Sequence, residues 1–198
     1  MSSRSTGSDF LNTWTQTSSH VVNSVLEANR AAFAAFGVES GPDDDGPEVA
    51  AEEEFPTWEV RLDTATEGEL AVGDAVEFSK TVSDADVKRF AASSGDTNPL
   101  HLDEEFASQT RFKGRIAHGT LVGGLISAAL ARLPGLTIYL SQDLEFHAPV
   151  RIGDRATAEC EVVEDLGRNQ YRLTTTVYAD DEVVIDGEAV VLIDERPD

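Results

Sequence analysis

Asp96 and His101 stand five positions apart in a short polar run, and together they could move protons. A carboxylate and an imidazole can supply the base and the acid of a proton-transfer reaction. Pro99 fixes its own φ and biases Asn98 toward an extended conformation, so the run can be a turn that aims both side chains into one cleft. Asn98 can brace this turn through side-chain hydrogen bonds. The alternative is a structural turn, with Asp96 bonded to backbone amides and His101 on the surface.

The run around these two residues, Gly95-Asp96-Thr97-Asn98-Pro99-Leu100-His101, resembles a known motif. It closely resembles the hydratase motif of the MaoC-like, (R)-specific enoyl-CoA hydratases, which have the hot dog fold. Phe90 before the motif and Ala107 after it also match the family pattern. The resemblance continues through residues 116–121 and 146–154, and it covers roughly residues 72–193.

The resemblance implies a reaction and a catalytic pair. The family adds water to trans-2-enoyl-CoA to give (R)-3-hydroxyacyl-CoA, and it also catalyses the reverse dehydration. Asp96 and His101 match the family residues that act around one water, although their spacing does not show which residue handles each proton. A branched or dicarboxylic acyl-CoA is an alternative substrate, because related folds share the motif.

Gly119 matches the glycine whose amide holds the thioester oxygen in this family. It stands near the amino end of a predicted helix, where unpaired N–H groups can bond an anionic oxygen. The alternative is a glycine needed only for tight packing. Ser127 matches a family serine close to the catalytic pair, but a buried hydroxyl could instead bond a carbonyl one turn earlier.

The phosphates of coenzyme A need cations or backbone amides despite the acidic composition. Arg111, Lys113 and Arg115 form the densest basic stretch and are the candidates, with charge balance beside the acids at 103–105 as the alternative. No Gly-rich nucleotide loop is visible, so we expect coenzyme A to enter as part of the substrate, without another cofactor.

The remaining histidines and the cysteine give no closed zinc spacing, so we expect no metal. His118 is interpreted as capping or ordering the entrance of the following helix. His147 is interpreted as structural, because it is remote in sequence from the acid–base pair. Cys160 is most simply a small core residue.

The elements that must position these residues begin near residue 74. Alternation over residues 75–80 predicts a strand, and Ser83 with Asp86 predicts the start of a helix that Gly95 ends. Asp103 can cap a second short helix. Apolar residues distributed around residues 116–133 predict a long buried helix, which is slightly short for a membrane span and ends at a basic residue.

The later part of the chain predicts four strands, at residues 136–146, 155–164, 171–179 and 183–193. From Ala156 to Val162, apolar residues alternate with polar ones, which predicts one buried and one wet face. A long helix placed before such strands indicates an α+β architecture, with an antiparallel sheet wrapped around the helix. The free edges of such a sheet favour a homodimer, which is also common in the family.

Three regions are predicted along the chain. Residues 1–37 carry an apolar stripe at helical spacing, which predicts an amphipathic helical appendage. Residues 38–57 form an acidic linker, and residues 58–198 form the hot dog domain. The appendage can pack on the domain or on a second copy, or it can attach to an apolar granule surface. A noncatalytic granule-associated or scaffold protein is therefore the alternative to an enzyme.

The composition sets limits on partners and solvent. The 198 residues include 15 Lys or Arg and 37 Asp or Glu, which gives a net charge of −22. Such a charge repels phosphate backbones and excludes nucleic acid as a favoured partner. An acid-rich, Lys-poor composition is typical of halophilic proteins, because high salt screens self-repulsion. The amino terminus lacks the apolar run of a secretory signal, so we expect a cytoplasmic protein, which the appendage could attach to a granule.

Overall fold

The computed structural model describes residues 50–51, 54–66 and 68–197. The predicted appendage and most of the predicted linker lie outside the described residues. The elements in chain order are β1 (Glu59–Asp63), β2 (Ala75–Thr81), α2 (Asp84–Ser94), α3 (Pro99–Leu102), α4 (Glu104–Ser108), α5 (Gly119–Leu130), β3 (Leu136–Phe146), β4 (Arg155–Gly167), β5 (Gln170–Ala179) and β6 (Glu182–Asp194).

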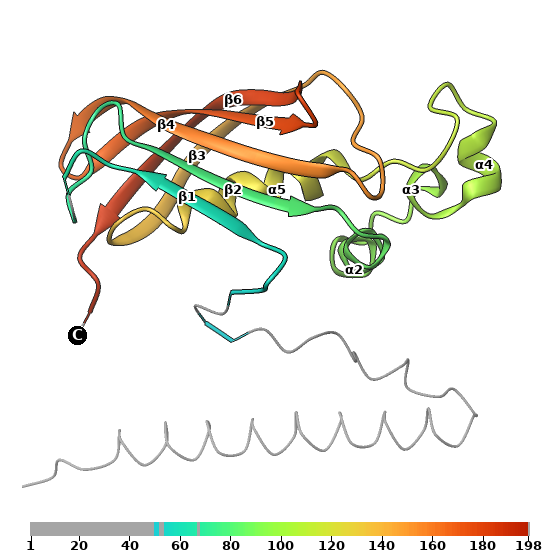
Figure 1. The fold of residues 1–198 in the computed structure, drawn as a ribbon, viewed down its shortest axis with the longest axis horizontal. Helices are drawn as coiled ribbons and strands as arrows, with labels where there is room; N and C mark the ends of the chain where they lie inside the picture. The colour runs from blue at the N-terminus through green and yellow to red at the C-terminus, as the bar shows by residue number, and fades with distance from the viewer. Residues whose placement is uncertain (1–49, 52–53, 67, 198) are drawn as a thin grey trace, which may run out of the picture. The chain divides into compact units, whose positions relative to one another are not determined.

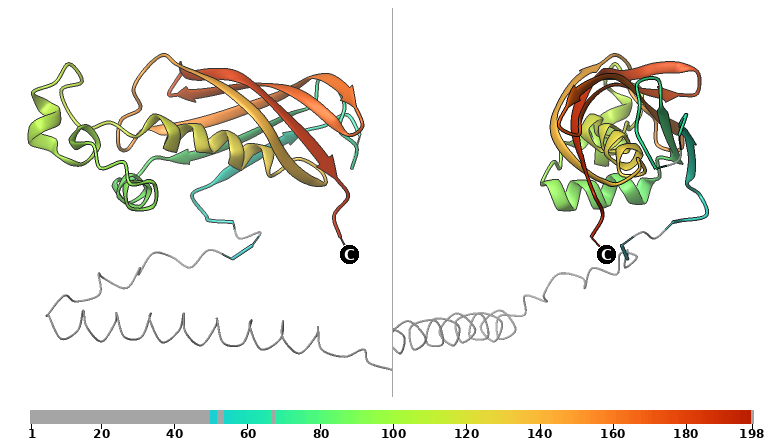
Figure 2. Two further views of the ribbon diagram at one scale, coloured as in Figure 1. Left: turned by 180° about the vertical axis from the view of Figure 1, so that it is seen from behind. Right: turned by 90° about the vertical axis from the view of Figure 1, so that its left-hand side faces the viewer.

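The strands form one antiparallel sheet that curves around α5. Their order across the sheet is β1-β2-β4-β5-β6-β3, and each neighbouring pair is antiparallel. Figure 1 shows the sheet lying over α5, and the end-on view of Figure 2 shows the helix enclosed by its curve. The predicted α+β architecture is confirmed.

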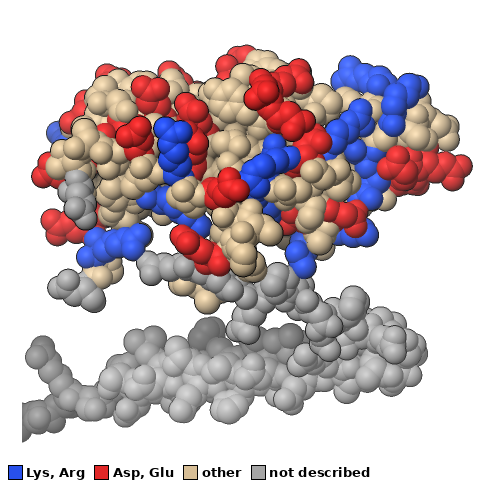
Figure 3. All heavy atoms as spheres, in the orientation of Figure 1, with Lys and Arg blue, Asp and Glu red and all other residues tan. Residues whose placement is uncertain are grey.

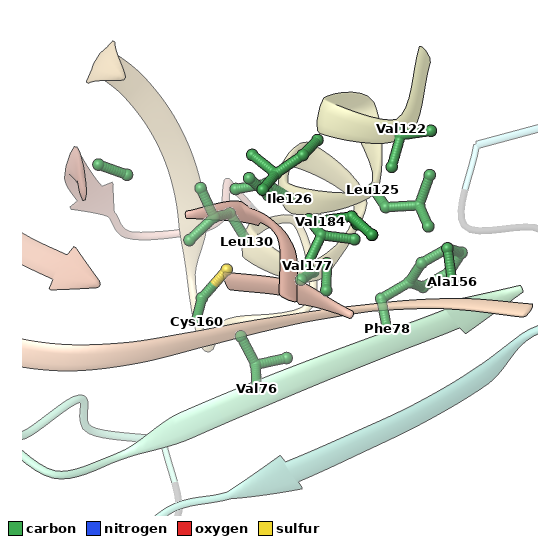
Figure 4. Packing of buried hydrophobic residues seen from close by; sticks show 14 of the residues in the cluster. Val76, Phe78, Val122, Leu125, Ile126, Leu130, Ala156, Cys160, Val177 and Val184 are labelled. Atoms are coloured by element: carbon green, nitrogen blue, oxygen red, sulfur yellow. The ribbon is translucent and has the colours of Figure 1, made fainter. Parts of the chain in front are cut away.

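The core lies between α5 and the concave face of the sheet. The alternating residues of β4 from Ala156 to Val162 face inward with no exposed area, as their pattern predicts. Val76 and Phe78 of β2 pair with residues of β4 and point into the same core (Figure 4). Cys160 is one of these buried residues, and burial raises the pKa of its thiol to about 12. Its interpretation as a core residue is confirmed.

Helix α5 is shorter than predicted and is not buried all round. The segment before it is extended, because Ile116 bridges Arg151 and the amide of Ala117 donates to the carbonyl of Val150 at 2.8 Å. The helix therefore begins at Gly119. One face packs into the core, and the other leaves small residues exposed. The buried residues are Val122, Leu125, Ile126, Ala129 and Leu130, and the exposed residues are Gly119, Thr120, Gly124 and Ser127.

The short elements before α5 follow the predicted capping signals. Ser83 and Asp86 form a capping box at the start of α2, and Gly95 ends that helix with φ 78°. Asp103 caps α4 by accepting a hydrogen bond from the amide of Phe106. Helix α3 was not predicted, because a helix of four residues leaves too short a pattern to detect.

Strand β1 was also not predicted. Each of its five residues is exposed, so it lacks the buried alternation by which the other strands were found. It lies at one end of the strand order, beside β2. Within the described part of the chain, no helix has both the length and the apolar composition needed to cross a bilayer.

Candidate active site

The turn between α2 and α3 holds Asp96 at the surface. Gly95 adopts a left-handed conformation that ends α2, and Asn98 caps α3 by accepting a hydrogen bond from the amide of Leu100 at 3.0 Å. Pro99 occupies the first turn of α3, where its missing N–H costs nothing. One carboxylate oxygen of Asp96 accepts from the amide of Asn98 at 3.2 Å. The carboxylate of Asp96 is therefore anchored on one side and exposed.

His101 lies in α3 and is 8% exposed, so its predicted alternative position on the surface is wrong. Its Nδ1 lies 2.9 Å from the carbonyl oxygen of Ile116. Because a carbonyl oxygen only accepts, Nδ1 carries the proton of this bond. This leaves Nε2 as the ring nitrogen available for chemistry.

The fold brings Asp96, His101 and His118 together. A carboxylate oxygen of Asp96 and one ring nitrogen from each histidine all lie within 4.8 Å of one another. The two imidazole rings stack, with centroids 3.9 Å apart. His118 stands at the N-cap position of α5, but its side chain makes no capping bond. Its Nε2 instead lies 3.0 Å from the carbonyl oxygen of Asp96, so capping by the side chain is wrong, whereas a bond that orders the entrance of the helix is found.

Gly119 lies beside His101 on one pocket of about 270 Å³. It is the first residue of α5, where the helix leaves its amide without an intrahelical acceptor. A Cβ at this position would lie 2.8 Å from Cε1 of Phe146. A side chain larger than hydrogen would therefore crowd Phe146, and the amide of Gly119 lies on the pocket that His101 lines. The pocket is lined further by Arg111, Phe112, Ile116, Ala117, Val122, Phe146, His147, Ala148, Pro149, Val150 and Ile185.

His147 lies nearer to the candidate site than its sequence position suggests, because it lines the same pocket as His101. Its Nε2 lies 2.5 Å from a carboxylate oxygen of Asp186, and both side chains are partly exposed. Remoteness in sequence therefore does not keep His147 away from this pocket. Its contact with Asp186 is compatible with a structural role, which stays a prediction.

The basic stretch before α5 divides between internal and exposed side chains. Arg115 donates from Nε to the carbonyl of His101 at 2.7 Å, and its Nη2 lies 2.8 Å from Asp84. Hydrogen bonds from Lys88 and Arg115 hold the pKa of Asp84 below its usual range. Arg115 is 16% exposed, and its guanidinium is thus engaged by the protein. This favours the charge-balance interpretation for Arg115.

Arg111 and Lys113 are exposed. The guanidinium of Arg111 lies 4.8 Å from the ring centroid of Phe112, and both residues line the pocket of His101. Lys113 occupies a tight turn with φ 58°. Figure 3 shows Lys and Arg side chains gathering at the end of the domain that carries α3 and α4. Arg111 is therefore the basic residue best placed to meet a ligand entering this pocket.

The two remaining predicted binding residues have different surroundings. Asn98 braces the turn between α2 and α3 through its side chain, as expected. Ser127 is exposed on α5, two turns beyond Gly119, and it is not among the residues that line the pocket. A buried hydroxyl at Ser127 is thus not found in this single chain.

Two groups of described residues place possible metal ligands within 4.8 Å of one another, which sequence spacing did not indicate. They are Asp96, His101 and His118, and Glu145, His147 and Asp186. In the first group each imidazole already uses one nitrogen on a backbone carbonyl. In the second, His147 is already paired with Asp186. Both groups are assembled by folding from separate segments.

Comparison with known proteins identifies the domain. A family model described as MaoC like domain matches residues 68–187. A 3-hydroxybutyryl-CoA dehydratase of Methylorubrum extorquens is 48% identical over 131 residues, which are 65% of this chain and 83% of that protein. An (R)-specific enoyl-CoA hydratase of Rhodospirillum rubrum is 45% identical over 133 residues, which are 65% of this chain and 91% of that protein.

Solved structures show the same relationship. An unliganded R-hydratase from Pseudomonas aeruginosa has a TM-score of 0.62 and 47% identity, covering 65% of this chain and 84% of its own. An (R)-hydratase from Aeromonas caviae, described as involved in PHA biosynthesis, has a TM-score of 0.61 and 43% identity. The match covers 63% of this chain and 97% of that chain.

The sheet curved around α5, with these neighbours, is a hot dog fold. The chain belongs to the MaoC-like family, as its hydratase motif indicated. It is an enzyme of the hydro-lyase class.

Proposed function

We propose that this enzyme adds water to trans-2-enoyl-CoA to give (R)-3-hydroxyacyl-CoA, and that it catalyses the reverse dehydration. The observation that carries the proposal is the convergence of Asp96 and His101, because a carboxylate oxygen of Asp96 and a ring nitrogen of His101 lie within 4.8 Å of each other. Relatives of this chain are named for the same hydration and dehydration chemistry. Coenzyme A enters as part of the substrate, and the proposed reaction uses no other cofactor.

Asp96 and His101 form the proposed acid–base pair. Hydration breaks the π bond between C2 and C3 and an O–H bond of water, and it forms a C3–O and a C2–H bond. One group must accept a proton from the water, and one must deliver a proton to C2. The exposed carboxylate of Asp96 and the free Nε2 of His101 can share these two tasks around one water. Because both groups lie on one side of the substrate, water adds to one face.

The amide of Gly119 is the proposed donor to the thioester oxygen. Negative charge develops on that oxygen when the nucleophile adds at C3. An amide at the start of α5 is aligned with the positive end of the helix dipole and can stabilise this charge. One such donor contributes about 3 to 4 kcal/mol to the transition state. The substrate carbonyl would therefore lie against Gly119, next to the ring of His101.

The pocket gives the substrate two kinds of surface. Val122, Phe146 and Ile185 are apolar and would contact the acyl chain. Arg111 is exposed on the same pocket and, with Lys113, would meet the phosphates of coenzyme A. Arg115 would act indirectly, because it holds α3 through the carbonyl of His101.

A homodimer through the edge strand β3 is part of the proposal. β3 is last in the strand order, so one of its edges has no strand beside it in the described residues. Its exposed apolar residues are Leu136, Ile138, Tyr139, Leu140 and Phe146, at 39–53% exposure. A second copy paired along this edge would cover them and leave no free edge there.

The cytoplasmic, granule-associated and halophilic assignments remain predictions from the sequence.

The test of the function is hydration of trans-2-butenoyl-CoA in high salt, followed by chiral analysis of the product. We expect the (R)-3-hydroxy product. Asp96→Asn and His101→Gln should each lower kcat by about 10² to 10⁴, the usual contribution of a positioned acid or base. Asp63→Asn, an exposed carboxylate on β1, is the matched control and should keep wild-type turnover. Unchanged turnover in both folded active-site variants would reject the proposed pair.

The oligomeric state is tested separately. Light scattering during gel filtration should give twice the mass of the chain. Leu140→Arg places a charge on the exposed edge of β3 and should shift the protein toward monomer. A wild-type protein that is monomeric at micromolar concentration contradicts the proposed dimer without affecting the assignment of the acid–base pair.

A further inference from the structure

His118 is a buried histidine that the proposed chemistry does not use. It is 1% exposed, although it stands at the entrance of α5 directly before Gly119. Its ring stacks on His101 at 3.9 Å and contacts Phe90 at 4.9 Å between centroids. A side chain in this position touches the proposed base or acid without being able to reach solvent. It therefore acts through its neighbours rather than on a substrate.

The hydrogen bond of His118 defines its tautomer. Its Nε2 lies 3.0 Å from the carbonyl oxygen of Asp96, which can only accept, so Nε2 carries the proton. Its Nδ1 is buried and has no hydrogen-bond partner in the described part of the chain. A charged ring would place an unpaired N–H at this position. The neutral ring, protonated on Nε2, fits the surroundings.

His101 and His118 bind each other's segments reciprocally. His101, on α3, donates to the carbonyl of Ile116 in the segment before α5. His118, in that segment, donates to the carbonyl of Asp96 in the turn before α3. The partners are 15 and 22 positions apart in sequence, and the two rings lie against each other. Together, the bonds fix the catalytic turn against the start of α5.

We propose that His118 is a positioning residue, which holds Asp96 in place relative to His101 and to the amide of Gly119. This inference rests on the proposed function. The bond to Asp96 is needed because the turn is otherwise exposed from Ala92 to Pro99 and is braced by short local contacts. His118 is adjacent to Gly119 in the chain, so one residue links the acid–base pair to the oxyanion donor.

A purely structural role makes a different prediction. A phenylalanine ring is flat like the imidazole, although somewhat larger, and leaves no unpaired nitrogen. Packing alone would therefore be served by an apolar ring. A buried, incompletely bonded imidazole at this position is instead accounted for by the proton that it donates. Stability and activity should therefore respond differently when the donor is removed and the ring is kept.

The experiment compares three variants in steady-state hydration of trans-2-butenoyl-CoA, with thermal unfolding measured in parallel. His118→Phe keeps the ring and loses the donor. His118→Gln can place an amide N–H near the position of Nε2, whereas His118→Asn reaches only as far as Nδ1. Gln and Asn are thus a matched pair with the same functional group and different reach.

We expect His118→Phe to keep the thermal midpoint and to lose about 10²-fold in kcat, the scale of loss caused by a misplacement of about 1 Å. KM should change little, because His118 is not among the residues lining the substrate pocket. His118→Gln should recover kcat to within about tenfold of wild type, whereas His118→Asn should not. Wild-type kcat in folded His118→Phe, or equal loss in the Gln and Asn variants, would overturn the proposal.

A measurement without substrate separates this inference from the proposed function. In ¹⁵N-labelled protein, the long-range ¹H–¹⁵N spectrum of His118 should show a neutral ring protonated on Nε2. If this tautomer is present but the wild-type protein does not hydrate the substrate, the proposed function is rejected and the hydrogen bond from His118 to Asp96 still stands. A ring protonated on Nδ1 would contradict the hydrogen bond from His118 to Asp96, whatever the activity.

Discussion

The core around α5 is built differently from the polar corner at the entrance of this helix. The corner consists of Asp96, His101, Arg115 and His118. The core is a cluster of buried apolar side chains that pack together (Figure 4). The corner is polar and is held by individual hydrogen bonds to the carbonyls of Ile116, Asp96 and His101. A lost core contact is spread over many neighbours, whereas a lost bond in the corner moves one reacting group. Substitutions in the core should therefore change stability alone. Substitutions in the corner should change rate, and they should also cost stability where a buried hydrogen bond or ion pair is lost.

The largest expected effect on stability is in the core. Leu130→Ala removes a side chain that is 1% exposed and should lower the free energy of unfolding by about 2 to 5 kcal/mol. The kcat of the folded fraction should be unchanged. Denaturant titration in high salt measures the free energy of unfolding. The control Leu166→Ala changes a leucine that is 39% exposed, and it should lower the free energy of unfolding by well under half as much. A proportional loss of kcat in folded Leu130→Ala would break the distinction.

Two arginines sharpen the comparison because one is internal to the corner and the other is exposed. Arg115→Gln loses the bond to the carbonyl of His101 and the ion pair with Asp84, so we expect a loss of about 1 to 3 kcal/mol in unfolding free energy. Arg111→Gln should leave stability unchanged and raise KM several-fold, because its charge faces the proposed phosphate site. Denaturant titration and steady-state kinetics on both variants provide the check. The reverse pattern would assign phosphate binding to Arg115.

Two glycines of α5 allow the effect of an added methyl group to be compared at the start and in the middle of the helix. Gly119→Ala places a Cβ 2.8 Å from the ring of Phe146, which is 53% exposed and can shift into the pocket. We expect a folded protein whose kcat/KM falls about tenfold, a loss of about 1.4 kcal/mol in transition-state stabilisation. Gly124→Ala meets no atom within 4 Å and should raise stability by about 0.5 to 1 kcal/mol. Both variants keep the backbone amide, so equal kinetics would contradict crowding of the pocket by a Cβ at Gly119.

The smallest expected effect lies at the start of α2, outside both regions. Burial raises the pKa of Asp86, but hydrogen bonds from Lys80 and Ser83 outweigh it and leave the pKa below its usual range. A lowered pKa in the folded state means that this stabilisation is present above pH 4 or so and is lost as pH falls through the folded pKa. Asp86→Asn should cost about 1 kcal/mol at pH 7, and the cost should shrink as pH falls below about 4 and through the folded pKa. Denaturant titrations across this range, at fixed salt, test the sign, and a difference that grows on acidification would contradict it.

Much of the fold could be predicted because its signals are local. The four later strands were found to within a few residues, and Ser83, Asp86 and Gly95 marked the limits of α2. Strand β1 was missed because it is short and wholly exposed, and helix α3 because it has four residues. The start of α5 was placed too early because the pairing of Ile116 with Arg151 outweighs the local helical pattern.

The sequence by itself determined the family and the helix that the sheet must enclose, and it proposed Asp96 and His101 as the acid–base pair. Motif spacing and hydrophobic periodicity are carried by residues close together in the chain. Only the tertiary structure decided that His118 binds Asp96, that Arg115 binds the carbonyl of His101, and that His147 lines the pocket. These contacts join segments 14 or more positions apart. Their partners are fixed by how α3 and the start of α5 pack, which no local pattern records.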